Sequence, residues 1–436
     1  MEIARLPGFR EFYPEDLALR SYIFQVWREV ARRYGFVEYD GPPLEPLELY
    51  TSKSGPEIVG QLYGFTDRGE REVALRPEMT PTFARMVSAR AAALPKPIKW
   101  FSIPQLFRYE RPQRGRLREH FQLNLDVVGE PDGAVDAELV AAAVDVLRAF
   151  GLGPQDFVAR VSDRRLIGAV LGALGIPQER RPSAFAALDR AEGDGEERVV
   201  AALGEAGASP EAARRILALG GMSLDAIADE FGSAHGVEEA AERLAGFFGA
   251  LNDFGLRAFV TFDATLVRGL AYYTGCVFEL WERSGEFRAI CGGGRYDNLL
   301  ASLGGVDLPA LGFGMGDVVL GELLKDRGLI PGGEAAIDDF VISVSEGERP
   351  LALRLVHALR EQGRRAAFDY RGRAVGRQFR AADQAGARRA IIVGPDEAAR
   401  QVALVREMAT GEERAVPLSE LLGDGRWRRD AHGEVR

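Results

Sequence analysis

The sequence predicts an α+β protein, in which a largely antiparallel sheet is interrupted by a helical insertion and followed by a smaller α/β domain. Three observations support this prediction. Residues 107–128 read as two strands joined by a basic loop. Residues from about 165 to 250 are rich in alanine and in helix signals. Residues 338–425 alternate between strand and helix patterns. A chain of 436 residues is long enough for roughly two to four domains.

The composition excludes several classes of protein. The chain has 55 basic and 65 acidic residues, a net charge of −10, which disfavours non-specific coating of nucleic acid but allows a local basic groove. Cys276 and Cys291 show no ligand-like spacing with the four histidines, so we expect neither a disulfide scaffold nor a structural metal. No signal pattern opens the chain, and no apolar run approaches the roughly 18–20 residues of a membrane span. We therefore expect a cytoplasmic protein that does not enter the membrane.

The first elements are a helix and an extended stretch. Apolar residues recur at helical spacing over residues 15–35, and Gly35 can end that helix. The Pro-rich stretch "VEYDGPPLEPLELY" follows. "REVALRPEMTPTFARMVSAR" then predicts a strand that leads into a helix near Thr80 and Pro81, because Pro suits the first helical turn. Glu78 is either an exposed acid at this helix start or a ligand for an ammonium group.

"FRYERPQRGRLREHFQLNLDVVG", residues 107–129, is expected to form a hairpin with one core face and one polar face. In the second strand, Gln122, Asn124 and Asp126 alternate with three apolar residues, Leu123, Leu125 and Val127. In the first strand the same alternation places Arg108 and Glu110 on one face. A sheet normally buries one face and leaves the other in water.

The loop of this hairpin, "RPQRGRLR", is basic and contains no acid. Its arginines could simply be solvent-exposed side chains on a pair of strands, without a ligand. They could instead clamp phosphates, because the planar guanidinium fork matches phosphate oxygens bidentately.

Two later stretches carry unusual residues. In "LVRGLAYYTGCVFE", Arg268 stands among apolar residues and therefore needs a partner, whereas Tyr272 and Tyr273 are either packing residues or ligands. In "ICGGGRYD", residues 292–294 form either a tight turn or a place where a ligand lies against bare backbone. "GFGMG", residues 312–316, predicts a strand that is closely approached by another group. Neither the P-loop nor the dinucleotide glycine pattern is present.

The insertion and the C-terminal region complete the fold. In the insertion, Ser209 and Pro210 predict a helix start and Gly220 a helix stop, and no chemistry is visible. Residues 338–425 predict a small domain with a largely parallel sheet and a basic segment, "RGRAVGRQFR". Residues 426–436 are expected to be a tail.

These motifs, in this order and over nearly the whole chain, resemble the histidyl-tRNA synthetase family, which is part of the class II synthetases. "FRYERPQRGRLREHFQ" resembles the motif 2 hairpin, "LVRGLAYYTGCVFE" and "AICGGGRYDNL" the two histidine-specific peptides, and the C-terminal region the anticodon-binding domain. "RPEMTP", "REHFQLNLD" and "GFGMGDVVLGELLKD" are most similar to a bacterial and plant-organellar branch. The resemblance implies a class II catalytic domain over residues 1–330 and an anticodon-binding domain over residues 338–425.

The resemblance also implies a reaction, in which histidine and ATP give histidyl-adenylate and pyrophosphate before histidine passes to tRNA(His). Arg108 and Arg268 would then be catalytic. Arg108 would hold the α-phosphate and the carboxylate side of the amino acid, and Arg268 would be a second cation there, standing in for a general metal site. Arg116 would clamp the outer phosphates and Glu110 would contact the adenine. Mg²⁺ would accompany ATP.

Six residues would bind histidine by the same resemblance. Three hold the ammonium group and the others, above all Asp126 and Tyr273, read the imidazole by matched hydrogen bonds; the six are Glu78, Thr80, Gln122, Asp126, Tyr272 and Tyr273. Arg111 and Gln113 in the loop would touch the acceptor end of the tRNA, and residues 371–380 would face the anticodon. The first helix and "GPPLEPLELY" resemble motif 1, which implies a homodimer.

The chain departs from the family pattern at two places. Asp317, Val318 and Val319 occupy the place where motif 3 usually has an acid and an arginine that stacks on adenine and reaches the γ-phosphate, so that arginine is missing. Position 126 is Asp where many members have Glu. The sequence leaves open which residue replaces the arginine and what the insertion does.

The missing arginine keeps two alternatives open. One is a regulatory paralogue of ATP phosphoribosyltransferase that senses histidine. Such paralogues generally lack the C-terminal domain and the peptide "LVRGLAYYTGCVFE", which we call the arginine peptide, and this chain keeps both. The other is an RNA-binding relative without catalysis, which the retained Arg108, Arg116 and Arg268 disfavour.

Overall fold

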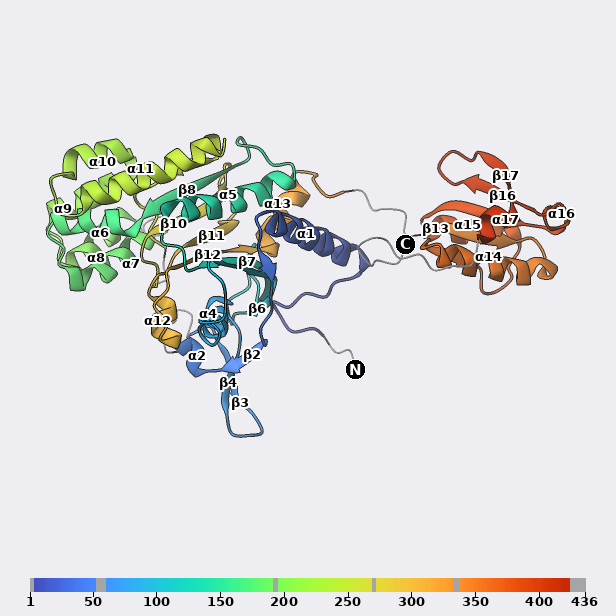
Figure 1. Cartoon of the computed structure of the whole chain (residues 1–436), viewed down its shortest axis with the longest axis horizontal. Helices are drawn as coiled ribbons and strands as arrows, with labels where there is room; N and C mark the ends of the chain where they lie inside the picture. The colour runs from blue at the N-terminus through green and yellow to red at the C-terminus, as the bar shows by residue number, and fades with distance from the viewer. Residues whose placement is uncertain (1–3, 52–59, 191–194, 269–271, 332–336, 424–436) are drawn as a thin grey trace. The chain divides into compact units, whose positions relative to one another are not determined.

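The computed structural model describes residues 4–51, 60–190, 195–268, 272–331 and 337–423. The chain divides into two compact units, Met1–Ile330 and Pro331–Arg436 (Figure 1). Two parts of the sequence predictions lie outside the described residues: residues 269–271 of the arginine peptide and the expected tail, residues 426–436. In the described part of the chain, no helix is long and apolar enough to cross a membrane.

The first unit is built on a nine-stranded sheet. The path of pairing runs β1-β5-β7-β12-β11-β10-β8-β9, and β6 pairs with β7 beside that path. All pairs are antiparallel except β1 with β5 and β8 with β9. This confirms the predicted α+β class. The strands are β1 (Val37–Glu38), β5 (Ile98–Ser102), β6 (Gln105–Phe107), β7 (Glu119–Val128), β8 (Phe157–Asp163), β9 (Val260–Phe262), β10 (Cys276–Glu282), β11 (Cys291–Arg295) and β12 (Ala310–Gly316).

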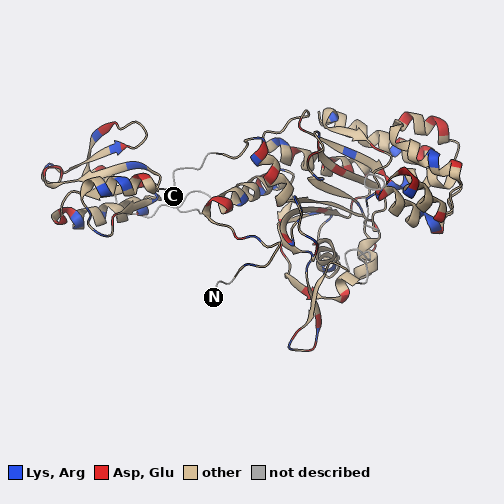
Figure 2. Ribbon diagram, turned by 180° about the vertical axis from the view of Figure 1, so that it is seen from behind, with Lys and Arg blue, Asp and Glu red and all other residues tan. Residues whose placement is uncertain are grey.

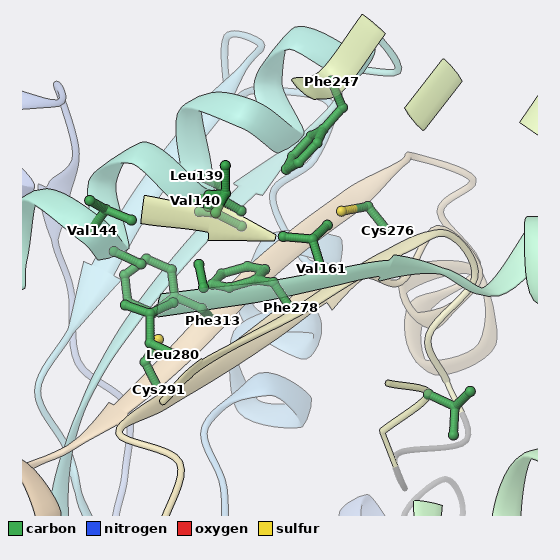
Figure 3. Close-up of a cluster of buried hydrophobic side chains, with 14 of the residues drawn as sticks. Leu139, Val140, Val144, Val161, Phe247, Cys276, Phe278, Leu280, Cys291 and Phe313 are labelled. Carbon is green, nitrogen blue, oxygen red and sulfur yellow. The ribbon is translucent and has the colours of Figure 1, made fainter. Parts of the chain in front are cut away.

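Helices cover one face of this sheet and make the main core. The apolar face of α5 lies over strands β10 and β12, where its Val144 packs near Leu280 and Phe313 (Figure 3). Cys276 and Cys291 lie in the same cluster as free, buried thiols. The helices of this layer are α1 (Pro14–Arg33), α5 (Gly133–Ala149) and α13 (Asp317–Asp326).

The opposite face of the sheet is polar. The sequence suggested that this face is exposed to water, but it is buried. Asn124 and Asp126 of β7 are only 5% and 3% exposed. A second core cluster, which includes Phe83, Tyr273 and Tyr296, covers the sheet on this side. The expectation of a solvated face is therefore wrong, because α4 and the side chains of Tyr272, Tyr273 and Tyr296 cover it. The covering elements are α2 (Glu48–Thr51), α4 (Thr80–Ser88), α12 (Leu299–Gly304) and a small sheet of β2 (Leu44–Pro46), β3 (Tyr63–Thr66) and β4 (Glu72–Leu75).

Between β8 and β9 the chain forms a set of helices. Ser209 caps one of them by accepting a hydrogen bond from the Ala212 backbone N–H at 3.1 Å. That helix ends at Ala218, and a 3₁₀ turn over Leu219–Gly221 follows it. The helices are α6 (Arg164–Ala173), α7 (Arg181–Asp189), α8 (Glu196–Glu205), α9 (Pro210–Ala218), α10 (Leu224–Phe231) and α11 (Val237–Asp253).

The second unit is a five-stranded sheet in the order β14-β13-β15-β16-β17. The three predicted strands pair in parallel, whereas β16 and β17 add an antiparallel edge that was not predicted. Figure 2 shows basic residues along its helices. Its elements are β13 (Ile337–Ser343), α14 (Arg349–Glu361), β14 (Ala366–Phe368), α15 (Val375–Gln384), β15 (Ala387–Val393), α16 (Pro395–Ala399), β16 (Val402–Glu407), β17 (Glu413–Pro417) and α17 (Leu418–Leu422).

Candidate active site

A cavity of about 930 Å³ opens on the polar face of the main sheet. Its walls come from the hairpin loop, from β10, β11 and β12, and from the start of α13. Five of the residues singled out in the sequence line it: Arg108, Glu110, Arg116, Gln122 and Arg268. The structure therefore brings together the arginines that the sequence presented in two separate segments.

The hairpin is shorter on its first side than the alternation predicted. Strand β6 ends at Phe107, so the expectation that Arg108 and Glu110 share one face of a strand is wrong, although both residues line the cavity. The chain instead bends back, and the Glu110 backbone N–H donates to the Arg108 carbonyl at 2.8 Å. Arg108 Nε donates to the Pro77 carbonyl at 3.0 Å, which fixes this guanidinium beside the segment that carries Glu78.

Arg116 and Glu110 face each other across this bend. Arg116 Nη2 donates to Glu110 Oε1 at 2.8 Å, and the Glu110 side chain is buried. The guanidinium has five N–H donors, so it can keep this pair and still bind an anion with its remaining N–H groups. Arg111 and Gln113 at the loop tip are exposed and do not line the cavity.

The floor of the site is made of glycines that leave room for polar side chains. A Cβ added to Gly292 of β11 would overlap the guanidinium of Arg268. Likewise, a Cβ on Gly312 would overlap the Asp126 carboxylate, and one on Gly314 would lie 2.6 Å from Gln122 Cδ. We call Gly292, Gly312 and Gly314 the glycine floor. The tight-turn interpretation of residues 292–294 is wrong, because they lie in strand β11.

Arg268 lies over this floor in a constrained backbone conformation. Its φ is +51°, a left-handed value that a non-glycine residue adopts at a cost. Arg164 Nη1 donates to the carbonyls of Val267 and Arg268, both at 3.3 Å. The sequence predicted that the charge of Arg268 needs a partner. That partner is Glu279, whose Oε1 lies 3.1 Å from Arg268 Nη1. Burial opposes the charged form of Arg268, but Tyr273 and Glu279 raise its pKa, so the side chain is a permanent cation.

Asp126 lies in a buried polar cluster beside the cavity. The Tyr296 hydroxyl donates to Asp126 Oδ1. Burial raises the pKa of the Asp126 carboxyl to about 7, against the opposing effect of the Tyr296 hydrogen bond. The carboxyl can therefore change its charge near neutral pH. Tyr296 was not singled out from the sequence, although it directly follows the "GGGR" stretch.

Glu78 belongs to the same cluster through a second tyrosine. The Tyr272 hydroxyl donates to Glu78 Oε2 at 3.3 Å and interacts with Thr80, which begins α4. The Tyr272 ring lies 5.9 Å from the ring of Tyr296 and 5.1 Å from that of Tyr273. Tyr273 in turn lies 5.8 Å from the Arg268 guanidinium, so it connects the cluster to the cavity.

Asp317 is an anchor of the fold and not a ligand in the cavity. Arg10 bridges two buried carboxylates, with Nη1 2.8 Å from Asp317 Oδ2 and Nε 2.6 Å from Glu119 Oε1. The Phe121 backbone N–H also donates to Asp317 at 2.9 Å. Sequence reasoning missed Arg10, since nothing in the periodicity of the N-terminal segment marks it.

His120 also lines the cavity. Burial and the nearby positive charges of Arg108 and Arg10 lower the pKa of its imidazole to about 3, so it is neutral at physiological pH. No group of three or more metal-ligating side chains occurs among residues 4–423 outside the undescribed gaps. The cationic side chains that line the cavity are arginines, among them Arg108, Arg116 and Arg268.

Comparisons with known proteins identify relatives over nearly the whole chain. A family profile described as histidyl-tRNA synthetase matches residues 8–316, and one described as anticodon binding domain matches residues 339–423. The histidine–tRNA ligase of Opitutus terrae is 46% identical over 420 residues, covering 95% of this chain and 96% of that protein. The chloroplastic/mitochondrial histidine–tRNA ligase of Arabidopsis thaliana is 40% identical, covering 95% and 85%.

Solved structures share the fold. The histidyl-tRNA synthetase of Nostoc sp. PCC 7120 superposes with a TM-score of 0.82 at 25% identity, covering 97% of this chain and 98% of that one. A Bacillus halodurans protein described as an ATP phosphoribosyltransferase regulatory subunit/histidyl-tRNA synthetase has a TM-score of 0.76 at 21% identity, covering 90% and 99%, which shows the fold alone. The matched family profile and the identity to these relatives show that the chain belongs to the histidyl-tRNA synthetase family.

Proposed function

We propose that this chain activates histidine with ATP and transfers it to the 3′ end of tRNA(His). As a member of this family the chain is an aminoacyl-tRNA ligase, with ATP, histidine and tRNA as its substrates. The observation that carries the assignment is the convergence of Arg108, Arg116 and Arg268 on one cavity, over a glycine floor that makes room for Arg268.

In the activation step, a histidine carboxylate oxygen attacks the α-phosphorus of ATP, and the bond to the bridging oxygen breaks as pyrophosphate leaves. Negative charge develops on the α-phosphate oxygens, and preorganised cations stabilise it. Arg108 and Arg268 supply that charge, since one is fixed by the Pro77 carbonyl and the other by Glu279. Arg116 binds the outer phosphates, and Glu110 contacts the adenine.

Mg²⁺ enters this proposal only as a companion of ATP. The ion prefers water and phosphate oxygens and is rarely held by an all-protein cage. Each acidic side chain of the cavity lies beside an arginine: Glu110 pairs with Arg116, Glu279 with Arg268 and Asp263 with Arg160, and Asp189 interacts with Arg164. The triphosphate itself would therefore hold the ion and neutralise part of its own charge.

The buried cluster is the proposed histidine site. Glu78, Thr80 and Gln122 bind the ammonium group, and Asp126 accepts a hydrogen bond from the imidazole. Tyr272 orients Glu78, and Tyr273 lies beside the ring. The support is that Glu78 and Asp126 are both held by tyrosine hydroxyls in a buried setting, where an unmatched substrate would leave polar groups without partners.

The remaining assignments concern tRNA and assembly. Arg111 and Gln113 are exposed at the loop tip, which suits contact with the acceptor end, and the second unit would bind the anticodon. A homodimer formed through α1 and the stretch of residues 41–50, and a cytoplasmic location, complete the proposal. The regulatory-paralogue alternative is not favoured, because the chain keeps both Arg268 and an anticodon-binding domain.

The test is ATP–pyrophosphate exchange with purified protein, with and without histidine, and with Arg268→Ala as the matched variant. We expect exchange that depends on histidine and falls about 10²- to 10³-fold in the variant. A folded wild-type protein that binds histidine but shows no exchange would overturn the assignment and favour the regulatory paralogue.

A further inference from the structure

We propose that Arg288, in the loop between β10 and β11, binds the outer phosphates of ATP and supplies the positive charge that is missing at Val319. Arg288 lines the same cavity as Arg108, Arg116 and Arg268. The inference rests on the proposed function and adds a residue to it, since the sequence analysis left the replacement for the missing arginine open.

The start of α13 leaves an uncharged wall in a site that must hold a triphosphate. Val318 and Val319 line the cavity there, and neither side chain carries a charge or a hydrogen-bond donor for an anion. Asp317, just before them, turns away into its ion pair with Arg10. A cation for this part of the cavity must therefore come from another element.

Arg288 lies near this wall. A Cβ placed on Gly115 of the hairpin loop would be 3.3 Å from Val319 Cγ2 and 3.9 Å from Arg288 Cδ. The side chains of Val319 and Arg288 thus both lie beside Gly115, the residue that precedes Arg116. The stem of Arg288 therefore lies within reach of the phosphates that Arg116 would clamp.

The loop that carries Arg288 is fixed by its neighbours. Phe287 is buried at 6% exposure, and the Arg114 guanidinium lies 5.1 Å from the centre of its ring. Arg114 Nε also lies 3.5 Å from Glu322 Oε2 of α13. The hairpin loop, the β10–β11 loop and α13 are thus tied together beside Arg288, while Arg288 itself is exposed.

The other cavity arginines are placed less well for this role. Arg160 is engaged by Asp263 at 3.8 Å and lies over the Trp281 ring at 5.1 Å. Arg190 ends α7 and donates to the Ala186 carbonyl of its own helix. Arg288 makes no hydrogen bond or ion pair with any residue that the structure describes, so its donors are available to an anion.

The test compares Arg288→Gln with Arg283→Gln, a matched loss of one charge from the same loop. Arg283 Nε donates to the Pro154 carbonyl and does not line the cavity. In histidine-dependent pyrophosphate exchange, Arg288→Gln should raise the KM for ATP roughly 10- to 100-fold, the loss expected for charge-assisted hydrogen bonds. The KM for histidine should not change. Arg288→Lys should recover most of the loss, and Arg283→Gln should stay within about twofold of wild type.

Calorimetric binding separates phosphate contact from a general disturbance of the site. Arg288→Gln should weaken binding of a non-hydrolysable ATP analogue but leave AMP binding unchanged, because AMP lacks the outer phosphates. An unchanged KM for ATP, or an equal loss of the analogue and of AMP, would overturn the role of Arg288. If the wild-type protein shows no exchange at all, it is the proposed function that fails, and the binding comparison still tests Arg288.

Discussion

The two sides of the site use polar groups in opposite ways. We call the open side the cavity around Arg108, Arg116 and Arg268, and the closed side the buried cluster of Glu78, Asp126 and the tyrosines that hold them. The open side is cationic and keeps its charge at any physiological pH. The closed side holds the Asp126 carboxyl. Burial raises its pKa to about 7, so its charge depends on pH near neutrality.

This difference fits what each side is proposed to recognise. A triphosphate is strongly charged and partly solvated, so cations in an open cavity can bind it while leaving room for it to enter and for pyrophosphate to leave. A neutral imidazole offers only a few hydrogen-bonding atoms. To select histidine over other amino acids, the site needs acceptors that are shielded from water and that only the imidazole can satisfy. The glycine floor serves both sides, because Gly292 accommodates Arg268 and Gly312 accommodates Asp126.

The largest expected effect comes from a substitution that disturbs the open side without replacing an arginine. Gly292→Ala places a methyl group where the Arg268 guanidinium lies. The guanidinium is the flexible end of a side chain, so the protein should fold and the cation should move off the α-phosphate. We expect histidine-dependent exchange to fall about 10²- to 10³-fold with little change in Tm, approaching the loss in Arg268→Ala.

Gly249→Ala in α11 is the control for this prediction. Nothing lies within 4 Å of a Cβ at Gly249, so its exchange rate and Tm should match wild type. If Gly292→Ala keeps full exchange activity, Arg268 does not need its present position, and the open side is not organised by the glycine floor.

A smaller effect is expected on the closed side. Asp126→Asn keeps an acceptor for the Tyr296 hydroxyl but removes the carboxylate that would accept the imidazole N–H. Loss of one charged acceptor predicts a roughly 10- to 100-fold fall in kcat/KM for histidine, with the KM for ATP unchanged. An equal change in both KM values would show that the two sides are not separate.

The same variant, Asp126→Asn, tests the raised pKa of Asp126 through the pH dependence of the unfolding free energy. Burial raises the pKa of the Asp126 carboxyl in the folded protein to about 7, above the ordinary value of 3.8. The protonated form therefore contributes stability that is fully present below about pH 4 and is lost as the pH rises to about 7, at about 1.4 kcal/mol per unit. The unfolding free energy of wild type relative to Asp126→Asn should fall over that window. Tyr296→Phe removes a hydrogen bond that lowers this pKa, so the fall should extend to higher pH; a flat difference would show that burial does not perturb Asp126.

The sequence predicted the parts of this site that follow from local pattern. Alternation in residues 122–127 correctly separated Leu125 from Asp126, and Thr80 begins α4 as the Thr-Pro step predicted. The expectation that a charge in an apolar run needs a partner is confirmed for Arg268, whose partner is Glu279. These inferences succeed because a strand period or a single buried charge constrains the structure whatever the rest of the chain does.

The parts that failed depend on contacts between distant segments. Strand β6 stops at Phe107 because the chain bends back on itself, and alternation carries no information about where pairing ends. The Arg10–Asp317 pair joins residues 307 positions apart. The polar face of β7 looked like a solvated face because the tyrosines that cover it come from residues 272–296. Periodicity reports which face is apolar, but it does not report what covers the polar one.

The smallest expected effect lies at the rim of the open side, where Arg111 and Gln113 are exposed and do not line the cavity. If they contact the acceptor end of tRNA, Arg111→Ala with Gln113→Ala should leave ATP–pyrophosphate exchange unchanged, because no tRNA takes part in that step. The KM for tRNA in aminoacylation should rise roughly three- to tenfold, and the slope of its logarithm against that of the salt concentration should fall by about one unit for the lost phosphate contact. A matched loss in exchange would instead place these residues at ATP, and the open side would then extend to the loop tip.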